Sequence, residues 1–108
     1  MTGLRGIGVV RVKVAGENKE HDVVVYSLSS CTPCKKTLRL LEGLGVEYEY
    51  IHLDTVDPDE RSEAMVEIGE FLPGRGIQLA YPIIVIDDLI TIIGFSERKL
   101  RKVFEGMP

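Results

Sequence analysis

The sequence predicts an α/β fold, in which a mixed four-stranded sheet is flanked by three helices and extended by an extra N-terminal strand. Two runs rich in β-branched and apolar residues, 23–28 and 83–86, have the composition of buried strands. Between the first run and a further strand at 46–54, segment 34–45 repeats its apolar residues at helical spacing. A strand–helix–strand unit makes its two strands parallel with a right-handed crossover.

The N-terminal region alternates apolar and basic residues, as a half-buried strand does. The apolar positions are Val10, Val12 and Val14, and the basic ones are Arg11 and Lys13. The polar turn at 16–20 is too short for a helical crossover to the strand at 23–28. We therefore expect an arm at 1–21 and a domain at 22–108, with the arm either covering an outer sheet edge or exchanged between two chains.

The first helix has Pro33 in its first turn, where a missing N–H has no cost, and Gly43 and Gly45 as stop signals. Asp57 and Pro58 predict the start of a second helix, with Asp57 as its cap. The expected buried stripe of that helix is Ala64, Ile68 and Phe71 or Leu72, with Met65 as core filler. Residues 73–76 predict the loop that follows.

A hairpin and a last helix complete the domain. Asp87 and Asp88 predict the turn between strands at 83–86 and 89–93. Ser96 is a suitable cap for a helix that buries Leu100, Val103 and Phe104.

Composition limits the possible functions. The chain has 108 residues, 44% of them hydrophobic, and a formal net charge of −4, which disfavours nucleic acid as the main partner. No apolar run reaches the roughly 18 residues of a membrane span, and no secretory leader pattern is found. These features predict a soluble cytoplasmic protein.

The only two cysteines form the motif Cys31-Thr32-Pro33-Cys34, at a strand-to-helix junction. A disulfide between them closes so small a loop that it constrains the unfolded chain little. A reversible, redox-active pair is therefore favoured over a structural bond.

The helix start predicts different roles for the two sulfur atoms. Unpaired N–H groups and the helix dipole stabilise a thiolate at Cys31, which makes it the expected nucleophile. Cys34 lies one turn further on the inner face, so we expect it to be buried and to displace the product. Pro33 removes a donor near the thiolate, which predicts a reducing rather than an oxidising pair, with Thr32 and Pro33 setting the potential.

Three local patterns together resemble the thioredoxin superfamily in its compact glutaredoxin-like form. They are Tyr26-Ser27 ahead of the cysteine motif, Tyr81-Pro82 before strand 83–86, and Gly94-Phe95 before the last helix. The resemblance implies that the Tyr81–Pro82 bond is cis and faces the disulfide, with the Tyr81 backbone available to an extended substrate chain. By the same resemblance, the expected substrate-binding residues are Thr32, Pro33, Tyr81, Pro82, Gly94 and Phe95.

Two differences from the glutaredoxin sequence pattern indicate which electron donor the chain uses. Glutaredoxins have a lysine for the glutathione carboxylate three residues before the first cysteine, where this chain has Leu28. Their glycine pair and acidic pair near the last helix are replaced by the sequence Gly-Phe-Ser-Glu at 94–97, similar to redoxins that receive electrons from a flavoprotein reductase. We expect a thiol–disulfide oxidoreductase without a bound cofactor, acting on protein disulfides and served by a thioredoxin-reductase-like enzyme.

Metal binding through the same cysteines is the alternative from another class. Structural zinc usually has four ligands, but the chain has no second cysteine pair, and His21 and His52 lack ligand spacing. A dimer sharing an iron–sulfur cluster remains the rival interpretation, testable by the colour of the purified protein.

Overall fold

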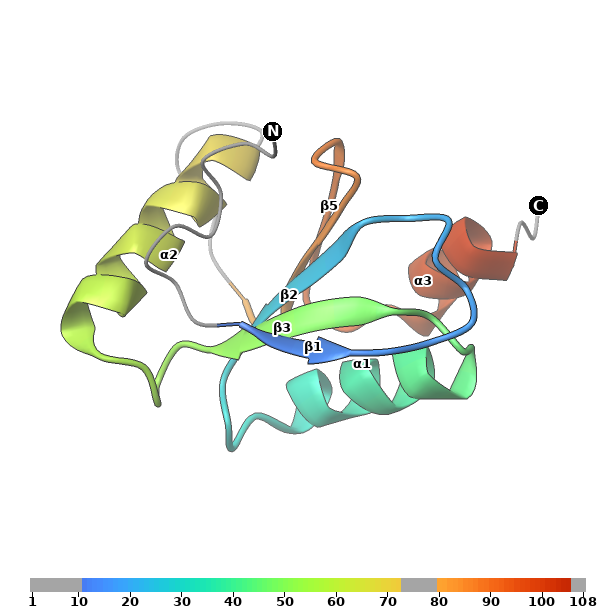
Figure 1. Ribbon diagram of the computed structural model, residues 1–108, viewed down its shortest axis with the longest axis horizontal. Coiled ribbons are helices and arrows are strands. Elements are labelled where there is room, and N and C mark those ends of the chain that lie inside the picture. Colours follow the sequence, from blue (N-terminus) through green and yellow to red (C-terminus); the bar gives the residue numbers. More distant parts are fainter. Residues whose placement is uncertain (1–10, 73–79, 106–108) are drawn as a thin grey trace.

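The structure is a computed structural model that describes residues 11–72 and 80–105 (Figure 1). Its elements are β1 (Val12–Val14), β2 (Val23–Ser27), α1 (Thr32–Gly43), β3 (Tyr48–His52), α2 (Pro58–Phe71), β4 (Ile83–Ile86), β5 (Ile90–Ile93) and α3 (Glu97–Glu105). The predicted order of strands and helices is confirmed, although the strands at 23–28, 46–54 and 89–93 are shorter than expected.

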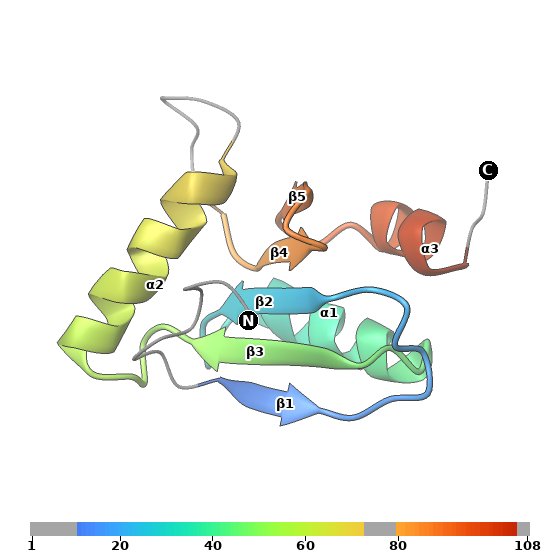
Figure 2. The ribbon, with the colours of Figure 1, turned by 45° about the horizontal axis from the view of Figure 1, so that its top comes forward.

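The strands form one mixed sheet in the order β1-β3-β2-β4-β5 (Figure 2). β2 is central: it pairs in parallel with β3 and antiparallel with β4, while β4 and β5 form an antiparallel hairpin. The expected four-stranded core and its extra strand are therefore both present. None of the described helices is long and apolar enough to span a bilayer.

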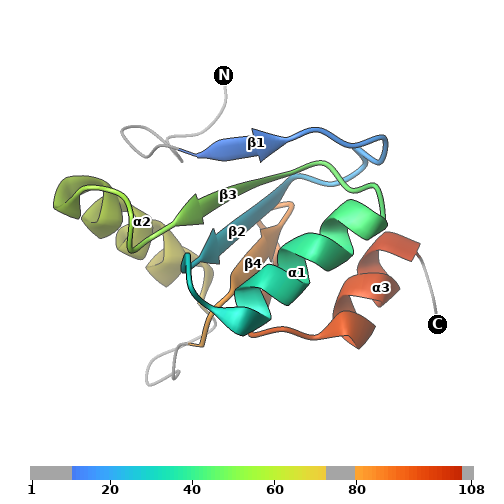
Figure 3. The same cartoon turned by 90° about the horizontal axis from the view of Figure 1, so that it is seen from below.

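Helices cover both faces of the sheet (Figure 3). Because successive strand residues point to opposite faces, Val24 and Tyr26 of β2 join the core under α2. Val23 and Val25 join the core shared with α1 and α3. α1 and α3 thus lie on one face, and α2 lies on the other.

The N-terminal strand covers an outer edge of the sheet within its own chain. β1 runs antiparallel to β3, and Arg11 beside it forms an ion pair with Glu67 of α2. The turn after β1 is also fastened to the start of β3: the Asn18 N–H donates to the Gly45 carbonyl at 2.9 Å, and the Glu47 N–H donates to the Asn18 carbonyl at 2.9 Å. Val10 lies outside the described residues.

α2 differs from its prediction in two respects. Asp57 occupies the cap position, but its side chain makes no capping hydrogen bond. Ala64 and Ile68 are buried as expected, whereas Met65 is exposed and Glu67 is buried. The Tyr26 hydroxyl donates to Glu67 at 2.8 Å, so the buried carboxylate has hydrogen-bonded and charged partners. The loop expected at 73–76 lies outside the described residues.

The hairpin and the last helix begin as the sequence indicated. Asp87 and Asp88 have φ angles of 57° and 55°, and the Leu89 N–H donates to the Ile86 carbonyl at 3.1 Å. This is a type I′ turn, in which both central residues are left-handed. The Ser96 hydroxyl accepts a hydrogen bond from the Lys99 N–H at 3.3 Å and caps α3.

Candidate active site

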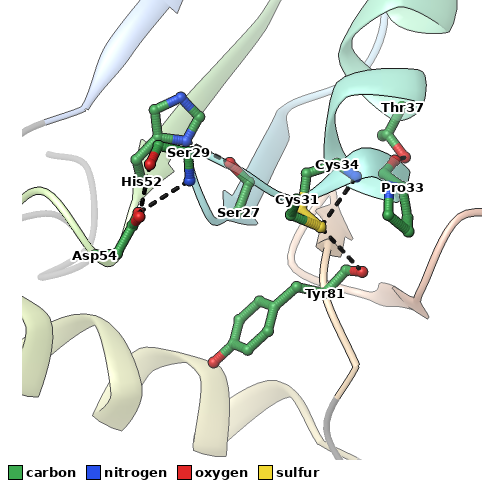
Figure 4. The surroundings of a disulfide bond; sticks show 9 residues. All are labelled: Ser27, Ser29, Cys31, Pro33, Cys34, Thr37, His52, Asp54 and Tyr81. Atoms are coloured by element: carbon green, nitrogen blue, oxygen red, sulfur yellow. Dashed lines mark hydrogen bonds between the residues drawn. A yellow bond between two sulfur atoms is a disulfide. The ribbon is translucent and has the colours of Figure 1, made fainter.

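The two cysteines are joined by a disulfide at the start of α1 (Figure 4). Cys31 is the residue before the helix, with an extended backbone, and its Sγ accepts a hydrogen bond from the Cys34 N–H at 3.2 Å. The sulfur thus takes the place that a serine or aspartate oxygen occupies in an ordinary helix cap. A donor at this position also stabilises the thiolate form of Cys31 after reduction.

Burial distinguishes the two sulfur-bearing residues. Cys34 is 1% exposed in the first turn of α1, whereas Cys31 is partly exposed. Thr32 and Pro33 between them are exposed. A substrate therefore has access to Cys31 from solvent, while Cys34 is positioned behind it.

The Tyr81–Pro82 peptide bond is cis, as expected. The Tyr81 carbonyl oxygen lies 3.8 Å from Cys31 Sγ, so this segment faces the disulfide. The Pro82 carbonyl accepts a hydrogen bond from the Gly94 N–H at 2.7 Å, and Gly94 has a φ of 83°, which favours glycine. Gly94 thereby supports the cis-proline segment, whereas Phe95 packs into the core under α1 and α3.

A carboxylate that the sequence analysis did not identify supports the loop before Cys31. Asp54 accepts hydrogen bonds from the Ser29 N–H at 2.9 Å and from the Ser29 hydroxyl at 2.6 Å. The bond from the Ser29 hydroxyl, followed by that from its N–H, lowers the pKa of Asp54. The Cys31 N–H donates to the Leu28 carbonyl at 3.4 Å, which closes the turn.

A second unpredicted contact lies where β2 and β3 end. Ser27 and His52 are neighbours in the parallel register, and the buried Ser27 Oγ lies 2.7 Å from His52 Nδ1. The buried hydroxyl therefore has a polar partner.

A shallow groove of about 250 Å³ adjoins Tyr81 on the α2 side. Its lining residues are Leu28, Leu53, Asp54, Arg61, Met65 and Tyr81. The Tyr81 ring points towards α2, and its hydroxyl donates to Met65 Sδ at 3.7 Å (Figure 4). Burial raises the pKa of that hydroxyl. Arg61 donates to the carbonyls of Leu53 and Val56.

Within residues 11–72 and 80–105, no three histidine, cysteine or acidic side chains are grouped so that they could hold a metal ion. His21 lies 2.6 Å from Asp87 at the hairpin turn and forms an edge contact with Phe104. His21 therefore bonds at the hairpin turn, whereas His52 bonds to Ser27 at the end of β2.

Comparison with known proteins identifies the family. The glutaredoxin family model matches residues 23–90, which include the disulfide, the cis proline and most of the sheet. The chain belongs to the glutaredoxin family. It is 30% identical over 95 residues to glutaredoxin 1 of Rickettsia felis, an alignment covering 82% of this chain and 85% of that protein.

Two solved structures have the same fold. The glutaredoxin from Methanosarcina mazei Go1 is 34% identical, with a TM-score of 0.74 over 87% of this chain and 86% of its own. Methanoredoxin from Methanosarcina acetivorans is 32% identical, with a TM-score of 0.76 over 86% of this chain and 94% of its own. This glutaredoxin-family chain thus has a thioredoxin-like fold and is a thiol–disulfide oxidoreductase with a Cys31–Cys34 redox pair.

Proposed function

We propose that the chain reduces disulfides of protein substrates and recovers its electrons from a flavoprotein reductase rather than from glutathione. The observation that carries the proposal is the unequal placement of the two sulfurs: Cys31 is accessible at a helix start, and Cys34 is buried one turn behind it. This arrangement suits attack on a substrate by one sulfur and internal displacement by the other.

The reaction is a two-electron exchange between two disulfides. The Cys31 thiolate attacks one sulfur of the substrate disulfide, which breaks the substrate S–S bond and releases one substrate thiolate. Cys34 then loses its proton and attacks Cys31 Sγ, which breaks the mixed disulfide and releases the second thiolate. The protein is left with its Cys31–Cys34 bond. The substrate has gained two electrons, and its two thiolates take up one proton from Cys34 and one from solvent.

The cis-proline segment supports an extended substrate. The Tyr81 carbonyl lies close to Cys31, so a polypeptide held there by backbone hydrogen bonds would present its disulfide to the nucleophile. The adjoining groove offers apolar surface from Leu28, Leu53 and Met65 to a neighbouring substrate side chain. We assign Thr32, Pro33, Tyr81, Pro82 and Gly94 to the substrate surface, and Phe95 to support beneath it.

The same groove favours a polypeptide over glutathione. Leu28 packs against the core under α2, at the position where glutaredoxins carry a carboxylate-binding lysine. The Asp54 carboxylate is held by Ser29, and two nitrogens of Arg61 donate to backbone carbonyls. Asp54 and Arg61 thus make hydrogen bonds within the chain, which leaves fewer polar groups in the groove to bind the charged ends of glutathione.

Single cysteine substitutions test the two roles. Cys31→Ser is expected to abolish attack on a substrate disulfide, whereas Cys34→Ser is expected to trap the mixed disulfide. Mass spectrometry of the protein after mixing with a disulfide peptide measures both outcomes. Trapping by Cys31→Ser instead would reverse the assignment.

A coupled assay tests the electron donor. NADPH oxidation is followed with thioredoxin reductase alone and with glutathione plus glutathione reductase, in the presence of a protein disulfide. Turnover is expected with thioredoxin reductase, and rapid turnover only with glutathione would refute the proposed donor.

We place the reaction in the cytoplasm because an electron-donating dithiol has to be kept reduced. A brown protein with sulfur-to-iron absorption would favour the cluster carrier instead.

A further inference from the structure

Basic side chains are concentrated on the helices of one face of the sheet, and acidic side chains on the helix of the other. The helices α1 and α3 carry seven basic and three acidic residues, whereas segment 57–71, which contains α2, carries six acidic residues and one basic residue. The whole chain has a net charge of −4. Figure 3 shows α1 and α3 together on one face of the sheet. By residue count that face is positive on a protein that is negative overall.

The acidic residues on that positive side are already engaged. Arg101 binds Glu97 at 2.8 Å and Glu105 at 3.1 Å, and Glu42 accepts a hydrogen bond from the Tyr48 hydroxyl at 3.2 Å. The other six basic side chains are exposed and make no ion pair within the described part of the chain. These six residues, named here the basic face, are Lys35, Lys36, Arg39, Arg98, Lys99 and Lys102.

The basic face adjoins the disulfide. Lys35 and Lys36 directly follow Cys34 in α1. The segment leading into α3 is attached to the active site, because the Gly94 N–H donates to the Pro82 carbonyl. Lys35 and Lys36 are therefore the basic residues nearest the disulfide along the chain, and α3 begins three residues after the segment bonded to Pro82. The acidic helix α2 borders the same site through the groove beside Tyr81.

We propose that the basic face selects protein substrates that carry acidic residues beside their reactive disulfide, an inference that rests on the proposed function. Complementary charge accelerates encounter, and like charge on the α2 side disfavours the opposite orientation. Exposed charges act over roughly a Debye length, so the preference is expected to weaken as salt is added. A protein partner is favoured over nucleic acid because the net charge is negative and α2 beside the same site is acidic.

Single-turnover kinetics test this selection without any reductase. The fully reduced protein is mixed with three peptides, each closed by one internal disulfide and flanked by glutamate, glutamine or lysine. Each rate is divided by the rate with dithiothreitol, which corrects for the intrinsic reactivity of the peptide disulfide. At low salt the glutamate peptide is expected to react roughly tenfold faster than the lysine peptide, and the ratio is expected to fall towards one in 0.5 M NaCl.

Matched double variants locate the effect. Arg98→Gln with Lys102→Gln removes two charges from α3 without altering α1, and Lys13→Gln with Lys19→Gln removes the same charge near the β1 edge. The first variant is expected to lower the rate with the glutamate peptide about threefold at low salt and to leave the glutamine peptide unchanged. The second variant is expected to retain the preference. Circular dichroism confirms that both variants are folded.

The outcomes separate the two proposals. Failure to reduce even the glutamine peptide would refute the proposed function. Reduction of all three peptides at equal normalised rates, or equal losses in both double variants, would refute the basic face alone. Tighter binding of duplex DNA than of the glutamate peptide at 0.15 M salt would also overturn it, because the face would then be a nucleic-acid surface.

Discussion

Replacing Pro33 with alanine is expected to make the redox pair more oxidising, because it adds a hydrogen-bond donor at the start of α1. Cys31 occupies the cap position, and its Sγ accepts a bond from the N–H of Cys34, the third helical residue. A capping side chain accepts from the second or third N–H of a helix. Pro33 is the second residue and has no N–H, so Pro33→Ala would offer the Cys31 thiolate a further donor.

The size of the effect follows from one added hydrogen bond to an anion. Such a bond contributes about 1.5–3 kcal/mol, and the partial exposure of Cys31 places the value near the lower end. About 1.4 kcal/mol corresponds to one pKa unit and to about 30 mV for a two-electron couple. We therefore expect Pro33→Ala to lower the pKa of Cys31 by about one unit and to raise the reduction potential by up to about 30 mV.

Two measurements test this prediction. Alkylation rates across pH, in a Cys34→Ser background, give the pKa of Cys31, and equilibration with a defined thiol–disulfide buffer gives the potential of the intact pair. Thr32→Ala is the matched comparison, because it changes the other side chain expected to influence the potential but adds no backbone N–H. If Pro33→Ala left both quantities unchanged, or moved them no further than Thr32→Ala, the donor argument would be wrong.

Three further predictions concern supports of the fold and site. Glu67→Gln breaks the buried ion pair between β1 and α2 and is expected to lower the free energy of unfolding by about 3 kcal/mol in urea titrations; an unchanged midpoint would contradict this. Asp54→Asn weakens the hold on Ser29 and should slow alkylation of Cys31 roughly threefold at pH 7, whereas an equal rate would show that the loop needs no such support. The hydrogen bond with His21 lowers the pKa of Asp87 in the folded protein. The ionised Asp87 side chain therefore stabilises the fold above about pH 4, and this stabilisation is lost as the pH falls through the lowered pKa. Asp87→Asn should therefore reduce the loss of stability between pH 5 and pH 2, and an unaltered acid profile would refute that contribution.

Local sequence signals predicted most of the site because its chemistry depends on near neighbours. The helix start, its proline and the inward position three residues later determine how Cys31 and Cys34 differ, and all of them lie within four consecutive residues. The cis bond before Pro82 was implied by family resemblance rather than by any local propensity, and the structure confirms it.

Contacts between distant segments were less predictable. The pairs Ser29–Asp54 and Ser27–His52 both join the end of β2 to the end of β3, or to the residues just after it. They depend on the parallel register of these strands, which apolar periodicity does not specify. The sequence did contain one indication of these contacts: polar residues lie at or just after the ends of two strands that were expected to be parallel, and the carboxyl ends of such strands meet at one edge of the sheet.

The orientation of α2 was harder to predict than its existence. Ala64 and Ile68 define a narrow buried stripe, and the neighbouring positions compete for the rest of that face. Hydrophobicity alone favours Met65, but Glu67 is buried instead because Arg11 and the Tyr26 hydroxyl provide it with partners. The same ion pair connects Arg11, next to β1, to α2 and so helps to hold the arm against β3 of its own chain. The alternation of valines had left open whether the arm covers an outer edge or is exchanged between two chains.

Reactivity and substrate recognition depend on different parts of this chain, so each can change without the other. The reactivity of Cys31 depends on one helix start, whereas the surfaces around it come from elements far apart in the sequence: the groove lies between Tyr81 and α2, and the basic face lies on α1 and α3. Exposed charges on those helices contribute little to folding, so substitutions there can change substrate choice while the redox pair keeps its potential. A substitution at Pro33 should mainly change the potential, because it alters the donors around the thiolate. It changes one exposed residue beside Cys31 but leaves the groove and the basic face in place.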